Sequence, residues 1–306
     1  MPKVSVIIPN YNHASYLKQR IDSVLNQTYQ DFEVIILDDC SIDNSKEIIE
    51  LYANHSKISH FVLNQINSGN TFKQWQKGFD LAQGELIWIA ESDDWCEPTL
   101  LANLIVGFEN EECVVSYCQS FIINENIIVW KSEHNTLGSF INGNTFIKEY
   151  MVFGNTICNA SMALFKRNAL KSISIEYQQF SFCGDWLFWI ELAKQGNIYT
   201  TGKVLNYFRK HGNDISGKAY STGLNFSEEI KILYSLQKDL LIDEKEFLKA
   251  LKNKYLKFKS VEANFSLEKG LEIRKKFFNN KKTTKYLKSR EFLTLKRIYG
   301  YMKRNL

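Results

Sequence analysis

The sequence predicts an α/β fold built on a mostly parallel sheet and followed by a helical extension. Short β-branched apolar runs alternate with helical patterns over the first 95 residues, and polar or acidic residues end each run. From Phe226 onward, apolar residues recur at intervals of three and four, which is typical of helices. Strands separated by single helices imply a parallel sheet with right-handed crossovers.

The first part of the chain contains four short apolar runs of the kind expected of buried strands. These predicted strands cover residues 4–8, 32–37, 58–63 and 86–90. Helical patterns occupy residues 14–26 and 72–81, and a third helix carries Ile48, Ile49 and Tyr52, with Asp43 as its predicted N-cap.

Residues 97–208 are less regular. Strands are predicted near residues 114–117, 127–130, 162–165 and 204–208, and a helix runs from Asp185 to Gln195 and ends at Gly196. We therefore predict two domains, an α/β domain over residues 1–222 and a basic helical extension over residues 223–306.

Charge is unevenly distributed along the chain. The net charge is only +4, yet residues 249–306 contain 18 Lys and Arg against 4 Asp and Glu. We expect an acidic body that holds a cation and a basic tail that meets an anionic surface. Apolar residues at helical spacing between Phe292 and Met302 predict a basic amphipathic helix. Such a helix either lies in a membrane interface or packs on the first domain with a solvated basic face. No nucleic-acid-binding motif accompanies the charge, so no nucleic acid partner is expected.

The compartment is predicted from features that the sequence lacks. No apolar stretch approaches the ~20 residues that cross a bilayer, and the first residues show no signal-peptide pattern. The six cysteines form no CxxC pair and are expected to be small buried residues. We expect a cytoplasmic protein, and the tail leaves open peripheral attachment to the inner face of the membrane.

Polar residues with the potential for chemistry follow three of the predicted strands. They are Tyr11-Asn12, Asp38-Asp39 and Ser92-Asp93-Asp94. Ligands of open parallel sheets bind beyond the carboxyl ends of the strands. Adjacent carboxylates there can ligate Mg²⁺ or Mn²⁺ and bond a ribose hydroxyl. The alternative is that these acids only favour a helix N-terminus.

Two further residues have two interpretations each. Asp185 begins an aromatic-rich helix, where it is either a helix cap or a general base with a raised pKa. His211 follows Arg209-Lys210, and it is either a surface residue or a nitrogen ligand of a cation site.

In combination, five segments strongly resemble the family 2 glycosyltransferases. They are residues 4–12 (VSVIIPNYN), 38–43 (DDCSID), 67–69 (NSG), 82–85 (AQGE) and 91–94 (ESDD). The resemblance implies the GT-A fold, a nucleotide-sandwich, and transfer from a nucleotide sugar with inversion. It is specific up to about Trp95, moderate to about Ser216, and absent beyond.

The resemblance also implies roles for single residues. Pro9, Tyr11 and Asp39 would contact the nucleotide, beside Asn12 in the same motif, and Asp93 would reach the ribose. Asp94 would bind Mn²⁺ or Mg²⁺, and His211 would contact the metal or the diphosphate. Asp185 would be the base. The list of predicted site residues is therefore Pro9, Tyr11, Asn12, Asp39, Lys73, Asp93, Asp94, Asp185 and His211.

Two positions depart from the family's pattern. Gly184 replaces the first acid of the usual Glu-Asp pair but leaves Asp185, the residue expected to act as base. Many relatives carry an Arg-Asn pair between the positions of Gly69 and Gly78. Arg is missing from this segment, so Lys73 or Lys77 is expected to contact the diphosphate instead.

The predicted function is therefore metal-dependent transfer of a sugar to a glycan or lipid-linked glycan, in the assembly of bacterial-type surface polysaccharide or lipopolysaccharide. A sugar nucleotidyltransferase is an alternative, although a Gly-rich loop with Arg and Lys is missing after the first strand. The other alternative is a catalytically inactive module that binds a nucleotide or a carbohydrate. A processive synthase is not expected, because the sequence has neither spanning segments nor a Gln-x-x-Arg-Trp motif.

Overall fold

The computed structural model describes residues 1–125, 127–212 and 215–288. The chain divides into two compact units. The first comprises Met1–Ile147 and Asn155–Asp214, and the second comprises Lys148–Gly154 and the chain from Ile215 onward. The domain boundary predicted between residues 222 and 223 differs from this structural division at residues 214 and 215, and it stays a prediction.

Within the described residues, the first unit contains one ten-stranded sheet. Its order is β3-β2-β1-β4-β9-β6-β10-β5, with β7 beside β6 and β8 beside β10. The strands are β1 Val4–Asn10, β2 Phe32–Asp38, β3 Ile58–Leu63, β4 Leu86–Ile89, β5 Trp95–Cys96, β6 Cys113–Asn124, β7 Ile127–Lys131, β8 Ser139–Ile141, β9 Ala163–Lys166 and β10 Asn197–Lys210.

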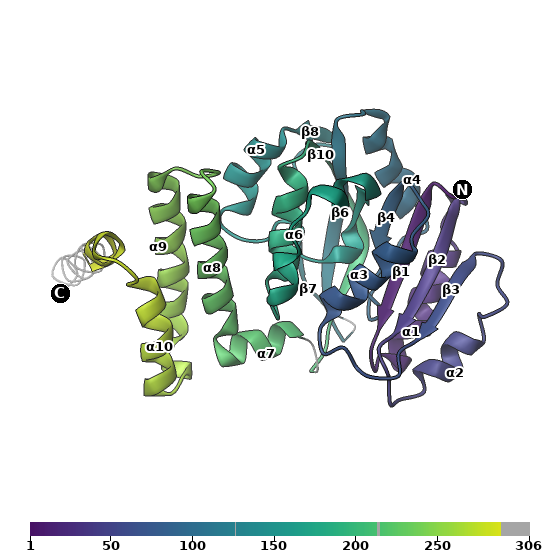
Figure 1. Cartoon of the computed structure of the whole chain (residues 1–306), viewed down its shortest axis with the longest axis horizontal. Helices are drawn as coiled ribbons and strands as arrows, with labels where there is room; N and C mark the ends of the chain where they lie inside the picture. The colour runs from purple at the N-terminus through teal and green to yellow at the C-terminus, as the bar shows by residue number, and fades with distance from the viewer. Residues whose placement is uncertain (126, 213–214, 289–306) are drawn as a thin grey trace. The chain divides into compact units, whose positions relative to one another are not determined.

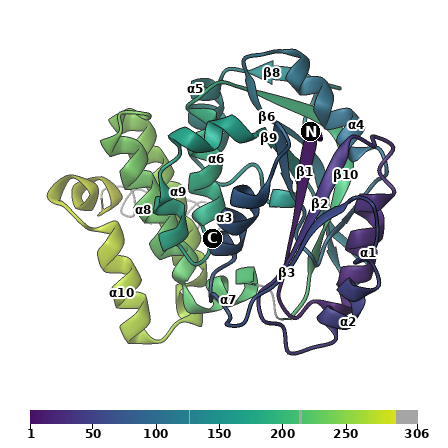
Figure 2. The same ribbon diagram turned by 45° about the vertical axis from the view of Figure 1, so that its right-hand side comes forward.

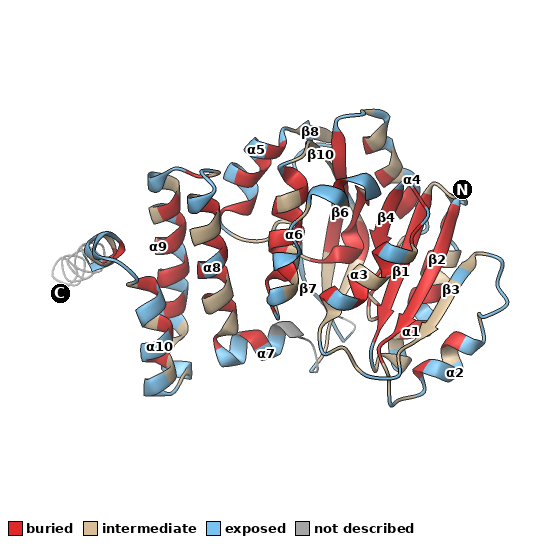
Figure 3. Ribbon diagram, viewed as in Figure 1, coloured by how far each residue is buried: buried red, intermediate tan, exposed pale blue. Residues whose placement is uncertain are grey.

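The four leading strands confirm the predicted α/β arrangement. β1 pairs in parallel with β2 and β4, and β2 pairs in parallel with β3. All residues of β1, β2 and β4 are buried (Figure 3), as expected of apolar strands covered on both faces. The remaining strands make the sheet mixed, because β9 lies antiparallel between β4 and β6.

The order of the leading strands determines which face each helix covers. From β1 through β3 the chain advances in one direction across the sheet, and α1 (Ala14–Leu25) and α2 (Ser45–Glu50) lie together on one face. From β3 it returns to β4, and α3 (Thr71–Leu81) covers the opposite face, as Figures 1 and 2 show. Right-handed crossovers require this change of face. The switch point therefore lies between β1 and β4, where such sheets bind ligands.

β10 belongs to the second half of the sheet, and its last residues lie near this switch point. β10 is longer than its predicted core at residues 204–208 and pairs in parallel with β6. The two residues of β5, which no sequence pattern predicted, pair antiparallel with Asn206 and Tyr207. The end of β10 is thereby held beside the segment that follows β4. The other elements of this unit are α4 Leu100–Ile105, η1 Val106–Glu109, α5 Gly143–Phe146, η3 Ala160–Met162, η4 Arg167–Ser172, η5 Ile175–Gln179 and α6 Gly184–Ala193.

The second unit is helical over its described residues, as the apolar spacing predicted. Its helices are α7 Ile215–Thr222, α8 Leu224–Lys238, α9 Glu244–Val261, η6 Glu262–Asn264 and α10 Leu267–Phe277, and η2 spans Ile147–Met151 at its junction with the first unit. Phe226 and Phe258 pack edge to face between α8 and α9. A buried ion pair joins Lys254 to Glu229 at 2.9 Å. Searched over the described residues, the helices include none with the length and apolar character of a membrane span.

Candidate active site

The loops after β1 and β2 are joined by polar side chains. Asn10 and Asp38 are register partners at the strand ends, and Asn10 Nδ2 donates to Asp38 Oδ2 at 2.7 Å. Asn12 has a positive φ of 57°, a conformation that Asn adopts more readily than most residues. Its side-chain oxygen accepts from the N–H of Ile42 at 2.8 Å, and its own N–H donates to Ser41 Oγ at 2.8 Å. Asn12 therefore ties the two loops together.

The carboxylate of Asp39 is buried and accepts hydrogen bonds from three residues. Ser68 donates through both its N–H and its hydroxyl, the latter at 2.7 Å. Asn64 Nδ2 and Gln74 Nε2 donate at 2.7 and 2.8 Å. A carboxylate with four donors is held in one orientation. These hydrogen bonds connect Asp39 to the loop that follows β3.

The other predicted nucleotide-binding residues differ in exposure. Pro9 is buried within β1, whereas Tyr11 is 46% exposed. Lys73 is exposed on α3, and its Nζ donates to the carbonyl of Ser68 at 3.1 Å. Tyr11 and Lys73 are thus available to a ligand beside a preformed loop.

Asp94 faces the interior of the first unit and has no exposed surface. Its Oδ2 accepts from Ser161 Oγ at 2.7 Å, and its Oδ1 accepts from the N–H of Arg209 at 3.0 Å. Arg20 is also fully buried, with its Nη2 3.7 Å from Asp94 Oδ2 and its Nε bonded to the carbonyl of Glu91. These partners direct the carboxylate away from the surface.

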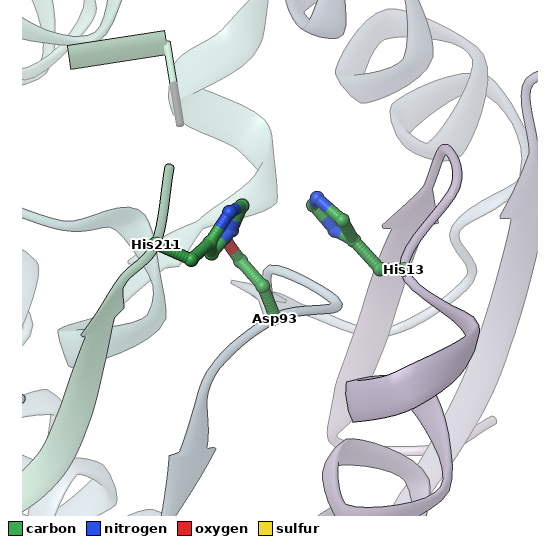
Figure 4. Close-up of side chains that lie close together, drawn as sticks. All are labelled: His13, Asp93 and His211. Atoms are coloured by element: carbon green, nitrogen blue, oxygen red, sulfur yellow. The ribbon is translucent and has the colours of Figure 1, made fainter. Parts of the chain in front are cut away.

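Asp93 lies instead against two histidines. His211 Nε2 is 3.1 Å from Asp93 Oδ2, and one ligand atom each of His13, Asp93 and His211 all lie within 4.8 Å of one another. Figure 4 shows the three side chains pointing toward one another from separate segments. His13 Nδ1 is hydrogen-bonded to Ser92 Oγ at 2.8 Å. The loop after β1, the turn after β4 and the end of β10 therefore meet at the switch point of the sheet.

The carboxylates after β4 differ in how readily they ionise. Burial and the neighbouring charges of Asp93 and Asp94 raise the pKa of Glu91 to about 8. Burial and Asp93 also raise the pKa of Asp94. Burial opposes ionisation of Asp93 as well, but the hydrogen bond from His211 and the nearby His13 outweigh it and lower its pKa. Of the three carboxylates, Asp93 therefore ionises most readily.

This group fits a divalent cation. One carboxylate oxygen and two imidazole nitrogens form a donor set suited to first-row metals such as Mn²⁺. Burial lowers the pKa of His13, which keeps its imidazole neutral and able to donate a lone pair.

Arg209 fixes the end of β10 to the turn after β4. Its guanidinium lies between the rings of Tyr16 and Trp95, at 4.4 and 4.5 Å from their centroids. Its Nη1 donates to the carbonyl of Asp93 at 2.8 Å. Such cation–π contacts hold the flat guanidinium in place, so Arg209 positions both Asp93 and the histidine that follows β10.

Asp185 lies at the start of α6, half-buried. Asn155 Nδ2 donates to its Oδ2 at 2.8 Å, and its Oδ1 accepts from the N–H of Trp186. A Cβ at Gly184 would lie 2.4 Å from both the ring of Phe72 and the carbonyl oxygen of Tyr177. This crowding leaves no room for a side chain at position 184.

Three residues of this arrangement were not predicted from the sequence. His13 follows the motif at residues 4–12, but a single histidine at a helix start gives no signal of its own. Arg209 and Asn155 act through contacts with residues far away in the chain, 116 and 30 positions apart. The strand-end position of His13, next to the motif at residues 4–12, was the one available clue.

Comparison with known proteins identifies the family. The sequence model of glycosyl transferase family 2 matches residues 5–174, more than half of the chain. The chain belongs to glycosyl transferase family 2. It is 30% identical to an uncharacterised glycosyltransferase of Nostoc, over 69% of this chain and 65% of that protein. The match thus spans just under two thirds of that relative.

Two relatives carry names that state what they act on. The chain is 29% identical to the poly(ribitol-phosphate) β-N-acetylglucosaminyltransferase TarP of Staphylococcus aureus, over 68% of this chain and 62% of TarP. It is 27% identical to the UDP-Glc:α-D-GlcNAc-diphosphoundecaprenol β-1,3-glucosyltransferase WfaP of Escherichia coli, over 76% of this chain and 86% of WfaP. This family 2 member is therefore a glycosyltransferase related to enzymes of cell-surface polysaccharides.

A solved structure supports the fold. Residues 1–349 of S. aureus TarS, in complex with UDP-GlcNAc, align with a TM-score of 0.70 and 19% identity. The alignment covers 90% of this chain and 79% of that one. The expected GT-A fold is thereby confirmed. Glycosyltransferases of this fold commonly use a divalent cation, which agrees with the donor set around Asp93.

Proposed function

We propose that this family 2 member transfers a sugar from a nucleotide sugar to an acceptor hydroxyl, with inversion, in the assembly of a bacterial-type surface polysaccharide. The observation that carries the proposal is the meeting of His13, Asp93 and His211 at the switch point of a GT-A sheet. Tyr11, beside Pro9, Asn12 and Asp39, would take the nucleotide, and Lys73 would contact the diphosphate.

Asp93 is the metal-binding carboxylate of this proposal. From the sequence, Asp94 was expected to bind the metal and Asp93 the ribose. Both oxygens of Asp94 have partners inside the unit, whereas Asp93 faces His13 and His211. A divalent cation, Mn²⁺ or Mg²⁺, held there supplies positive charge that stabilises the leaving diphosphate.

Asp185 is the proposed base. In the inverting step, the acceptor oxygen bonds to the anomeric carbon as the bond from that carbon to the diphosphate breaks. The acceptor's proton passes to Asp185, and the electron pair leaves with the nucleoside diphosphate. Asn155 donates to Asp185 Oδ2 and the N–H of Trp186 donates to Oδ1, and these two bonds orient the carboxylate.

Two acceptor classes are consistent with the relatives' names, a polyol-phosphate polymer and a sugar on a prenyl diphosphate carrier. A cytoplasmic location is proposed with either. The proposed membrane attachment rests on residues 292–302, which lie outside the described residues. Full-length protein should sediment with anionic liposomes and detach as salt rises, and truncation after Asn280 should abolish binding. Failure to bind at low salt would remove this part of the proposal.

A panel of nucleotide sugars tests the proposed function. One donor should raise the unfolding midpoint in the presence of Mn²⁺ and then release its nucleoside diphosphate. Release of pyrophosphate with a sugar phosphate and a nucleoside triphosphate would indicate a nucleotidyltransferase. Binding without turnover, over a range of acceptors, would indicate an inactive binding module.

A further inference from the structure

β7 exposes four consecutive apolar side chains. Ile127, Ile128, Val129 and Trp130 each expose between 52% and 67% of their surface. Successive side chains of a strand point to opposite faces, so both faces of β7 are apolar. Among the described strands, β7 pairs with β6 and no other. Exposed edge strands usually carry charges or proline, and in β7 the one charged residue is Lys131 at its end.

The apolar strand is continuous with the rim of the candidate active site. Asn124 of β6 is the register partner of Ile127 on one side and of Lys210 on the other. Neighbouring strands lie about 4.8 Å apart, which puts the backbones of Ile127 and Lys210 about 10 Å apart. His211 follows Lys210 directly. The candidate active site at His211, the cation of Lys210 and the apolar edge strand β7 therefore follow one another along the sheet.

We propose that Lys210 and β7 bind the prenyl diphosphate of a lipid-carried acceptor. The sugar of such an acceptor enters the site, its diphosphate lies beside Lys210, and its prenyl chain runs along β7. This inference rests on the proposed function and selects one of its two acceptor classes.

The order of groups in this acceptor matches the order on the protein. A sugar is followed by two negative charges and then by a long hydrocarbon chain. A polyol-phosphate polymer has no hydrocarbon with which to cover β7. A protein strand added to the edge would satisfy the backbone of β7 but would leave the apolar side chains of both its faces in water. A flexible prenyl chain can contact both faces.

Binding of farnesyl diphosphate, compared with inorganic diphosphate, tests the inference. Calorimetry is performed with Mn²⁺ and excess UDP, which occupies the nucleotide's diphosphate position. Burial of roughly two methylene groups changes affinity about tenfold, so we expect farnesyl diphosphate to bind at least about tenfold more tightly. The double variant Ile128→Ser with Trp130→Ser should lose this preference. Leu137→Ser, at another exposed apolar residue of the same unit, should retain it.

Three outcomes would overturn the inference. The first is equal affinity for the two diphosphates in the unaltered protein. The second is a prenyl preference that survives the double substitution. The third is a dimer, detected by light scattering, that the double substitution dissociates, because β7 would then be an interface between copies. Nucleotide-sugar turnover without a prenyl acceptor is measured separately, so failure of the proposed function is distinguishable from failure of this inference.

Discussion

His211 Nε2 lies 3.1 Å from Asp93 Oδ2, although 118 positions separate the two residues. The contact forms because β10 runs beside β5 and its last residues meet the turn after β4. Arg209 holds the same turn through the carbonyl of Asp93. The pair therefore connects the two halves of the sheet at the proposed cation site.

Asp93→Ala should abolish stimulation by Mn²⁺, because the cation loses its carboxylate ligand. Sugar transfer should fall by ~10² or more, as when a group that stabilises transition-state charge is removed. Unfolding without metal should change little. The measurement is the initial rate of nucleoside diphosphate release over a Mn²⁺ titration. An Asp93→Ala variant that retained full Mn²⁺ stimulation would contradict the assignment.

Asp94→Ala is the matched comparison and should act mainly on stability. It leaves the buried Arg20 without its carboxylate partner, 3.7 Å away. Removal of one partner of a buried ion pair costs ~3–5 kcal/mol. The measurement is urea unfolding in the presence of a chelator. A fully stable Asp94→Ala variant that lost only its metal response would restore Asp94 as the ligand.

Asp185→Asn should lower kcat by ~10²–10⁴, because an amide cannot take the acceptor's proton. The dissociation constant of the donor should barely change, since the change is close to isosteric. Steady-state kinetics and calorimetry measure the two quantities. A near-normal kcat would leave Asp185 as a structural residue of the start of α6.

Asn155→Asp should move the acid limb of the kcat–pH profile to higher pH. The new carboxylate would lie 2.8 Å from Asp185, where the amide nitrogen now donates. A nearby like charge raises the pKa of a carboxylic acid, and the proposed base works only when it is deprotonated. Asn155→Ala should lower kcat without this charge-driven shift. Identical profiles for the two variants would argue against an electrostatic link.

Glu33→Gln should reduce the loss of stability in acid. Burial opposes ionisation of Glu33, but hydrogen bonds from Ser5 and from the N–H of Gln83 outweigh it and lower its pKa below the usual 4.5. A lowered pKa in the folded state contributes stability that is present above pH 4.5 and is lost as the pH falls through the lowered value. Urea unfolding from pH 6 downward should show a shallower slope for the variant. An unchanged slope would mean that Glu33 does not contribute.

The sequence alone predicted the leading α/β strands and the helical end of the chain. Each depends on local periodicity, because a buried strand needs apolar residues throughout and an amphipathic helix needs them at three- and four-residue intervals. The motifs at strand ends also predicted the edge of the sheet at which His13 and Asp93 meet. Local patterns could not order β9, β6 and β10, since their pairing depends on contacts between distant segments.

Tertiary structure alone decided which way each acid of the Asp93-Asp94 pair faces. The two residues are adjacent and chemically alike, so their sequence positions do not distinguish them. Ser161 and the backbone of Arg209 bind Asp94 inside the unit, whereas His13 and His211 approach Asp93 from two other segments. The same holds at Gly184, where the ring of Phe72 and the carbonyl of Tyr177 leave no room for a side chain. Residue types and spacing indicated which chemistry to expect, and the packing of distant segments determined which side chains lie together.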